Sequence, residues 1–275
     1  MLRLKINDYE MAFVDVGPGV GAGGTPLLCI HGSLNDYRAW SPVMGPLSQG
    51  RRVIVPSLRH YFPEHWNGQG GSFTIAQHVA DVIAFIESLD LGPIDLLGHS
   101  RGGHIAFRVA EERPDLLRRL VLAEPGGELD ASLALPAVDG AASAPRTYVA
   151  EAAAKMHAGD INGGLRAFKD GVDGTGTWDG LPEADKQLRR DNAFTLLAQS
   201  NEQRRPFARS EAESISIPTL IVAGANTHGA LPIIARVLAE HIQGADFVSI
   251  ADATHVMFAQ QPVAFSEAVL AFLDS

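Results

Sequence analysis

The sequence predicts an α/β protein in which a mostly parallel sheet is flanked by helices and interrupted by one helical insertion. Short runs of almost wholly apolar residues recur along the chain, as expected of strands that helices cover on both faces. Stretches with helical periodicity lie between these runs, and this alternation is typical of parallel strands joined by right-handed crossovers. Between residues 125 and 214 the alternation stops, which indicates the insertion.

Eight apolar runs are predicted as strands of one sheet. The first two lie near the start of the chain, and the later runs are nearly all apolar, which favours burial on both faces. In chain order the runs are LRLKI, MAFVDV, LLCIH (27–31), RVIVP (52–56), IDLLG (94–98), RLVLAE (119–124), TLIVAG (219–224) and DFVSI (246–250).

Three helices are predicted between and after these strands. The stretch 74–91 places its apolar residues on one helical face behind a Thr74 N-cap. The stretch 100–112 stops before a proline, and 262–273 opens with Pro262 in its first turn.

The insertion is predicted to be helical after an initial loop. The alanine-rich part, residues 131–144, is predicted as a mobile loop. Helical stretches follow near 146–158, 161–170 and 182–200. We therefore expect a core formed by residues 1–124 and 215–275, with residues 125–214 as a helical cap over the carboxyl edge of the sheet.

Composition and charge exclude several kinds of partner. The net charge is −10 without a block of lysine or arginine, so we expect no binding of nucleic acid or of an anionic membrane surface. No apolar run approaches the ~20 residues of a membrane-spanning helix, and the first ten residues lack a leader pattern, so a cytoplasmic protein is expected. Cys29, the single cysteine, is predicted to be a buried structural residue. The predicted partner is a small-molecule substrate, and the number of subunits stays open, with a homodimer as one option.

The motif GHSRG at 98–102 predicts a nucleophile. It lies between a predicted strand and a predicted helix, which is the setting of the G-x-S-x-G elbow. A strained backbone in such an elbow holds the serine hydroxyl clear of the chain, at a helix start that favours developing negative charge. Ser100 is therefore the candidate nucleophile, and a tight structural turn is the alternative.

A serine hydroxyl needs an imidazole as base and an acid that orients the imidazole. His255 is the candidate base. It lies in ADATHVMF (251–258), the loop between the last predicted strand and the final helix, and position separates it from the other histidines. Only this loop is expected to approach the elbow.

A second strand end offers hydrogen-bond donors for the reaction. Gly32 follows His31 there and permits a sharp turn of the chain. The backbone N–H of Ser33 could then pair with that of Arg101 as an oxyanion hole, a device worth roughly 10²–10³ in rate for each donor.

These features together resemble the α/β-hydrolase superfamily over essentially the whole chain. The resemblance rests on His31-Gly32, the elbow at 98–102, the late His255 and the inserted cap. It implies the α/β-hydrolase fold. It does not imply one reaction, because one scaffold hosts many activities.

The resemblance leaves the position of the acid open. Family members usually carry it after the strand in PTLIVAGANTHGA (218–230), and this sequence has Asn226 there. Asparagine gives an imidazolium no negative charge, so either the triad is impaired or another carboxylate serves. Glu124 ends the neighbouring strand, ~4.8 Å away in a sheet, and some family members, including haloalkane dehalogenases, a lactone hydrolase and cofactor-free dioxygenases, place their acid there. Asp252 is the rival in the loop of His255, and a solvated loop charge is the alternative for Glu124.

Aromatic side chains are candidates for the substrate pocket. The loop 57–71 is larger than the glycine-led loop common in the family, and it either forms an aromatic wall or packs beneath the cap. The pocket candidates are His31, Trp40, Tyr61, Trp66 and Trp178. No metal-binding histidine pattern and no nucleotide-binding glycine loop is present, so no metal and no cofactor is expected. GVGAGG (19–24) opens no helix and is predicted as a flexible turn.

The predicted function is a serine hydrolase for a small, mostly apolar ester, lactone or activated carbonyl compound, with carbon–carbon bond hydrolysis as a close variant. A cofactor-free dioxygenase, in which the histidine and the acid act as base, is one alternative. A non-enzymatic receptor for a small ligand is the other. Haloalkane dehalogenation and epoxide opening are disfavoured, because those relatives need a carboxylate nucleophile at the position of Ser100.

Overall fold

The strands form one sheet with a single antiparallel edge. The computed structural model describes residues 1–19, 21, 23–133 and 147–275. Its eight-stranded sheet has the order β1-β2-β4-β3-β5-β6-β7-β8. β2 pairs antiparallel with β1 and β4, and all other neighbours are parallel. The strands are β1 Leu2–Ile6, β2 Tyr9–Val16, β3 Gly24–Ile30, β4 Arg51–Pro56, β5 Ile94–His99, β6 Leu117–Ala123, β7 Thr219–Gly224 and β8 Asp246–Ile250. The predicted α/β class and mostly parallel sheet are confirmed.

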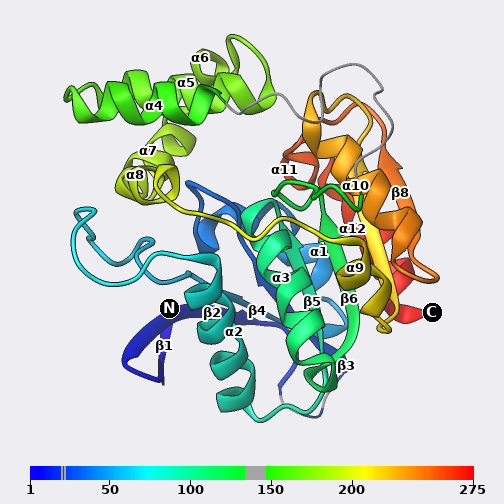
Figure 1. Ribbon diagram of the computed structural model, residues 1–275. Coiled ribbons are helices and arrows are strands. Elements are labelled where there is room, and N and C mark those ends of the chain that lie inside the picture. Colours follow the sequence, from blue (N-terminus) through cyan, green and yellow to red (C-terminus); the bar gives the residue numbers. More distant parts are fainter. Residues whose placement is uncertain (20, 22, 134–146) are drawn as a thin grey trace.

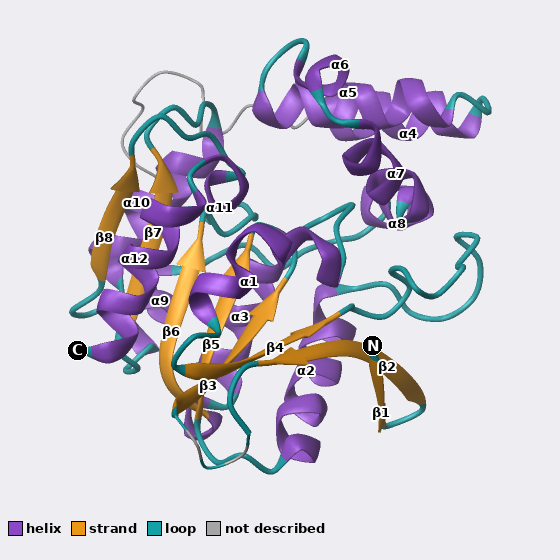
Figure 2. Ribbon diagram, turned by 180° about the vertical axis from the view of Figure 1, so that it is seen from behind, coloured by secondary structure: helices purple, strands orange, loops and turns teal. Residues whose placement is uncertain are grey.

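Helices cover both faces of this sheet (Figures 1 and 2). One face carries α2 Ile75–Leu89, α3 Arg101–Glu112, α9 Arg209–Ser214 and α10 Ala230–His241. The other carries α1 Ser41–Leu47, α11 Met257–Gln260 and α12 Pro262–Asp274. Two short 3₁₀ helices, Tyr37–Trp40 and Pro114–Leu116, join these elements. Within the described ranges no helix has the length and apolar character needed to cross a bilayer.

Alternation along β3 shows how the strands serve two cores. Leu28 and Ile30 lie in the cluster with α2 and α3, whereas Leu27 and Cys29 lie in the cluster with α1 and α12. Successive side chains of a strand point to opposite faces, so a strand covered on both sides must be apolar throughout. This is why the strands read as continuous apolar runs, and Cys29 is buried as predicted.

The three predicted helices are present, and their ends follow the signals in the sequence. The Thr74 hydroxyl accepts a 3.0 Å hydrogen bond from the N–H of Gln77 and so caps α2. Pro262 occupies the first position of α12, where its missing N–H costs no hydrogen bond. The helices α1 and α10 have no counterpart among the predicted elements.

A stack of helices lies beyond the carboxyl ends of the strands (Figure 1). It consists of α4 Thr147–His157, α5 Ile161–Asp173, α6 Thr177–Gly180, α7 Glu183–Asp191 and α8 Ala193–Ser200, close to the predicted helical stretches. The helices α4, α5, α6 and α8 share a small apolar core, and Leu34 from the loop after β3 belongs to it. The loop predicted for 131–144 falls almost wholly outside the described residues, as do two residues of the 19–24 turn.

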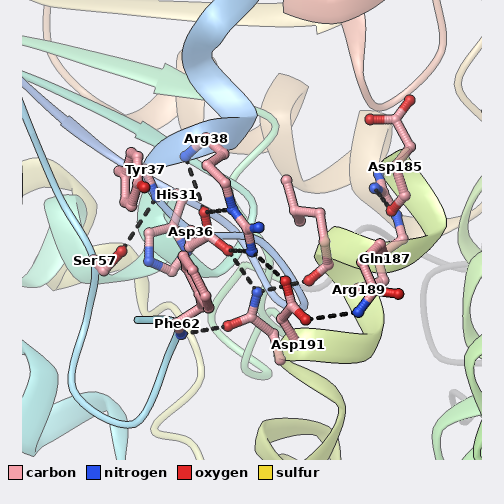
Figure 3. A network of polar contacts seen from close by, with 12 residues as sticks. His31, Asp36, Tyr37, Arg38, Ser57, Phe62, Asp185, Gln187, Arg189 and Asp191 are labelled. Atoms are coloured by element: carbon pink, nitrogen blue, oxygen red, sulfur yellow. Dashed lines mark hydrogen bonds and ion pairs between the residues drawn. The ribbon is translucent and has the colours of Figure 1, made fainter. Parts of the chain in front are cut away.

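Polar contacts attach this stack to the loops below it (Figure 3). Arg38 binds the carboxylate of Asp36 through Nε and Nη2, and Nη2 also contacts Asp191 at 2.9 Å. The amide of Asn192 donates to Asp36 at 2.7 Å and accepts from the N–H of Phe62 at 2.7 Å. Asp36 is fully buried, so its contacts with Arg38 and with Asn192, between α7 and α8, offset the cost of removing its charge from water.

Candidate active site

Ser100 stands at a strained turn between β5 and α3. Its φ of 55° and ψ of −119° lie outside the regions that residues with side chains favour. The surrounding backbone holds this geometry, because the N–H of Ser100 donates to Ala123 and its carbonyl accepts from His104 and Gly126. The flanking glycines are required, since a Cβ at Gly98 or Gly102 would overlap a neighbouring carbonyl oxygen. The elbow therefore has the strained geometry that its motif predicts.

Glu124 and His255 form a buried contact. Nδ1 of His255 donates to Oε2 of Glu124 over 2.7 Å, and both side chains are almost completely shielded from solvent. The other carboxylate oxygen accepts a 2.9 Å hydrogen bond from the N–H of Gly224. Because Nδ1 carries the hydrogen in this contact, Nε2 is the nitrogen left to take a proton.

The two rival positions for the acid differ from Glu124 in exposure. Asn226 is exposed, and its N–H donates to the carbonyl of Ala253 at 2.8 Å. Asp252 is also exposed, on the surface of the loop that carries His255. Glu124 is the carboxylate that the structure brings against the imidazole.

His99 contacts both the backbone and the ring of His255. It was not predicted as a site residue from the sequence. Its Nε2 donates to the carbonyl of His255 at 2.8 Å, and the two rings lie 4.5 Å apart. Burial, together with the neighbouring His255, holds the pKa of His99 well below its usual range, so the ring is neutral. Its position directly before the nucleophile is the one sequence signal that could have found it.

Ser100 and His255 border the same small cavity, of about 40 Å³. Among the described residues, the Ser100 hydroxyl makes no hydrogen bond to the imidazole of His255. In enzymes of this kind such a contact often forms only when substrate is bound. The helices α5 and α7 supply the facing wall. The lining residues are Ser33, Leu34, Asn35, His99, Ser100, Phe168, Lys169, Val172, Asp173, Arg189, His255 and Val256.

The two predicted oxyanion donors lie beside Ser100. Ser33 borders the cavity, and Gly32 packs so closely that a Cβ there would lie 2.9 Å from Cβ of Ser100. Arg101 is the first residue of α3, so its N–H has no acceptor within the helix. The Arg101 side chain turns away into a buried ion pair with Glu202.

Lys169 and Arg189 were not among the sequence-based candidates, yet both border the cavity. They also border a second cavity of about 320 Å³ next to the first. Lys169 pairs with Asp173 at 2.6 Å, and burial lowers the pKa of Lys169. Arg189 donates to the carbonyl of Asp185, and the described residues give its guanidinium no ion pair. Charged residues on helices usually face solvent, so nothing in the sequence marks these two.

The five predicted pocket residues lie elsewhere. His31 fixes a loop, because Nδ1 donates to Gly32 and Nε2 accepts from Leu58, and burial lowers its pKa to about 4. Tyr61 packs edge-on against His31, at 4.7 Å between ring centres. None of the five is among the described residues that line the cavity at Ser100.

Two of the tryptophans pack in apolar cores, and the third stacks on a neighbouring ring. Trp40 lies in the core, 4.7 Å from the ring of Phe258. Trp66 stacks on His60 at 4.2 Å, so part of the 57–71 loop packs on itself. Trp178 is buried in the apolar core of the upper helices. Of the two open possibilities for the loop, packing beneath those helices fits the contact of Phe62 with Asn192.

The described part of the chain has no cluster of three or more histidine, cysteine, aspartate or glutamate side chains arranged to hold a metal ion. At the elbow, the side chains that the structure places together are the Ser100 hydroxyl and the imidazole of His255, with the buried carboxylate of Glu124 behind the imidazole.

Comparison with known proteins gives concordant results. A family model described as alpha/beta hydrolase fold matches residues 25–262. The chain is 35% identical over 107 residues to a 2-hydroxy-6-oxo-2,4-heptadienoate hydrolase from Pseudomonas putida, covering 38% of each chain. It is 31% identical over 124 residues to the lipase LipV from Mycobacterium tuberculosis, covering 45% of this chain and 46% of the lipase. The chain thus spans less than half the length of these curated relatives that it matches.

A solved structure resembles the whole chain. The enol-lactonase from Burkholderia xenovorans LB400 superposes with a TM-score of 0.81 over the full length of both chains, at 21% identity. At this identity the likeness concerns the fold alone.

Proposed function

The chain belongs to the α/β-hydrolase fold family, and from this premise we propose that it is a serine hydrolase. Its substrate is a small ester, lactone or activated carbonyl compound, and the reaction passes through an acyl-enzyme on Ser100. The buried contact between His255 and Glu124 is the observation that carries this proposal.

The contact matters because a neutral imidazole must become an imidazolium during the reaction. The Ser100 hydroxyl gives its proton to Nε2 of His255 as its oxygen forms a bond to the carbonyl carbon. The resulting positive charge is stabilised by the carboxylate of Glu124, which also fixes the orientation of the ring through Nδ1. A solvated loop glutamate would supply neither orientation nor a desolvated charge.

The remaining steps use the same groups. Electrons of the carbonyl double bond move to its oxygen, and the N–H groups of Ser33 and Arg101 donate to that oxyanion. When the tetrahedral intermediate collapses, the leaving alcohol takes the proton from His255. Water then attacks the acyl-enzyme and gives a proton to His255; as the bond to Ser100 breaks, His255 returns this proton to the Ser100 oxygen and the acid is released.

The cavity walls indicate the shape of the substrate. The cavity next to Ser100 is small, and Leu34, Phe168, Val172 and Val256 line much of it, so a short apolar group fits there. The larger neighbouring cavity is bordered by Lys169 and Arg189, which suit a polar or anionic group farther from the scissile bond.

Names of similar proteins fit this class. One relative is named as a hydrolase of a 2-hydroxy-6-oxo-2,4-heptadienoate, and one structural neighbour as an enol-lactonase. The first name denotes an oxo compound with a carboxylate and the second a lactone. Hydrolysis at an activated carbonyl is therefore an activity that this fold supports in similar chains.

Kinetics of two variants test the proposal. With a panel of chromogenic esters and lactones, Ser100→Ala and His255→Ala are each expected to lose at least about 10³ of kcat, because nucleophile and base act as one unit. Oxygen consumption is measured in parallel on heteroaromatic substrates. Substantial turnover by Ser100→Ala with loss in His255→Ala, accompanied by oxygen uptake, would replace the hydrolase by a cofactor-free dioxygenase.

A receptor is distinguished by a different result. Tight binding of a small ligand, with no ester or lactone turned over and no label on Ser100 from a fluorophosphonate, would show that the site binds without chemistry. Turnover that depends on both Ser100 and His255 would support the hydrolase.

A further inference from the structure

The loop that carries one oxyanion donor is attached to the upper helices rather than to the sheet. The Ser33 hydroxyl donates to Oε1 of Gln199, in α8, at 2.6 Å. The next residue, Leu34, is buried in the apolar core formed by α4, α5, α6 and α8. Both side chains of this short loop are therefore held by helices far away in the sequence.

This attachment supports a strained backbone. Leu34 has a φ of 59°, a left-handed conformation that is unfavourable for a residue with a side chain. The direction of the Ser33 N–H depends on the same turn. The contacts of Ser33 and Leu34 with the helices hold this unfavourable turn in place.

Arg101, whose N–H is the second oxyanion donor, is attached through its side chain to the end of α8. The guanidinium of Arg101 binds Glu202 through two hydrogen bonds, of 2.5 and 3.0 Å, and both side chains are fully buried. Burial opposes the charge of Glu202, but Arg101 and Arg204 lower its pKa, so the carboxylate is ionised. Arg101 also lies 4.5 Å above the ring of Phe73.

Gln199 and Glu202 belong to one turn at the end of α8. The N–H of Glu202 donates to the carbonyl of Gln199 at 3.3 Å. Gln199 also borders a cavity shared with Ser33, Ser100 and Arg101. The two residues that offer N–H groups to an oxyanion are thus each bound, through their side chains, to a single turn.

We propose that Gln199 and Glu202 are positioning residues that set the distance and direction between the two oxyanion donors. The upper helices then assemble the oxyanion hole when they are seated on the core. The inference rests on the proposed function, because it needs an oxyanion to be formed at Ser100. Neither Gln199 nor Glu202 touches the reacting atoms, and both act through Ser33 and Arg101.

A double-mutant cycle tests whether Gln199 acts through Ser33. Gln199→Met keeps the length of the side chain and removes the acceptor, and Ser33→Ala removes the donor but keeps the N–H. Gln203→Met, at the exposed neighbouring position, is the matched control. Hydrolysis of 4-nitrophenyl butyrate and the rate of labelling by a fluorophosphonate are measured, with thermal unfolding to show that each variant is folded.

The expected result is a loss of kcat without a matching change in KM. A misdirected donor should lower kcat by about 10–100-fold, somewhat less than complete removal of a donor. The double variant should be no slower than either single variant, and Gln199→Glu, which keeps an acceptor oxygen, should recover most of the rate. Glu202→Gln should lower kcat in the same manner through Arg101.

Affinity for a boronic acid that mimics the tetrahedral intermediate gives a second measurement. It should fall with kcat in Gln199→Met, whereas affinity for butyrate, the acid product, should stay unchanged. A purely structural role would change both or neither. Two results, obtained while Ser100 is still labelled, would overturn the inference. One is an unchanged kcat in Gln199→Met, and the other is a double variant whose loss of kcat equals the product of the two single losses. A wild-type protein that is not labelled at Ser100 would overturn the proposed function, and this inference with it.

Discussion

Nδ1 of His255 donates a hydrogen bond of 2.7 Å to the carboxylate of Glu124, which is held at the end of β6 by a second hydrogen bond from the N–H of Gly224. Asn226, at the position where the family usually carries an acid, lies on the surface instead. The carboxylate is therefore supplied by the strand next to the usual one, and it reaches the imidazole because neighbouring strands lie close together.

The first prediction concerns this carboxylate. Glu124→Gln keeps the shape of the side chain but removes the charge that stabilises the imidazolium, and its amide can stabilise the wrong tautomer. We expect kcat to fall by about 10³–10⁴-fold, the effect of the equivalent change in a serine protease triad. Asn226→Ala is the control and should keep near-normal rates. If the two variants exchanged these results, the acid would have to be assigned to the other strand.

The second prediction concerns the close packing at Gly32. Gly32→Ala adds a Cβ that would lie 2.9 Å from Cβ of Ser100 and 3.0 Å from Nδ1 of His99, so the nucleophile must move. A displacement of this size should lower kcat/KM by about 100-fold. Gly45→Ala, in α1 where a Cβ meets no atom within 4 Å, should leave the rate unchanged. A Gly32→Ala variant within threefold of the wild-type rate would show that the packing does not set the position of Ser100.

The third prediction concerns Arg189. Arg189 borders both cavities, so it should favour a substrate with a carboxylate. The substrates are monoethyl glutarate and its uncharged carboxamide analogue, and the quantity measured is the ratio of their kcat/KM values. Arg189→Gln should lower this ratio by about 10–100-fold, the value of one charge-assisted hydrogen bond. Arg190→Gln is the control, because Arg190 pairs with Glu183 outside the cavity. An equal loss for both substrates would mean that Arg189 only supports the fold.

The fourth prediction concerns stability at low pH. Burial lowers the pKa of His31 to about 4, and burial also holds the pKa values of His78, His99 and His104 well below the usual value near 6.5. Below about pH 6.5 the unfolded chain therefore binds more protons than the folded chain. The free energy of unfolding consequently decreases as the pH is lowered from about 6.5. Each such histidine contributes at most about 1.4 kcal/mol for each pH unit.

Urea unfolding at pH 7.5, 6.5 and 5.5 measures this effect. Most carboxylates titrate below the window, near pH 4, so the loss between pH 6.5 and 5.5 reports the histidines. We expect the free energy of unfolding to drop by several kcal/mol, on the order of 4, across that interval and by less between pH 7.5 and 6.5. A value independent of pH would show that these four side chains are accessible to protons in the folded protein.

The fold could be predicted from the sequence because its signals are local. Apolar runs, the Thr74 cap and Pro262 each depend on neighbours in the chain, and the structure confirms the elements that they predict. The α/β-hydrolase family is confirmed as well. The elbow and His255 could be proposed for the same reason, since a motif and a place in the strand order define them.

Contacts between distant segments could not be predicted in this way. The sequence suggests Trp40 and Trp66 as pocket residues. In the structure Trp40 packs in the core against Phe258, and Trp66 stacks on His60. Arg101 and Glu202 are separated by about a hundred residues, and no periodicity links them. Lys169 gives no signal either, because a lysine on a helix is usually solvated.

Covalent labelling of Ser100 shows whether this residue is the nucleophile. The wild-type protein is treated with a fluorophosphonate, digested, and its peptides are mapped by mass spectrometry, with Ser100→Ala treated in parallel. We expect one adduct, on the peptide that contains Ser100, together with complete loss of esterase activity, and no adduct in Ser100→Ala. An active esterase that carries the adduct on another residue, or carries none, would contradict this expectation.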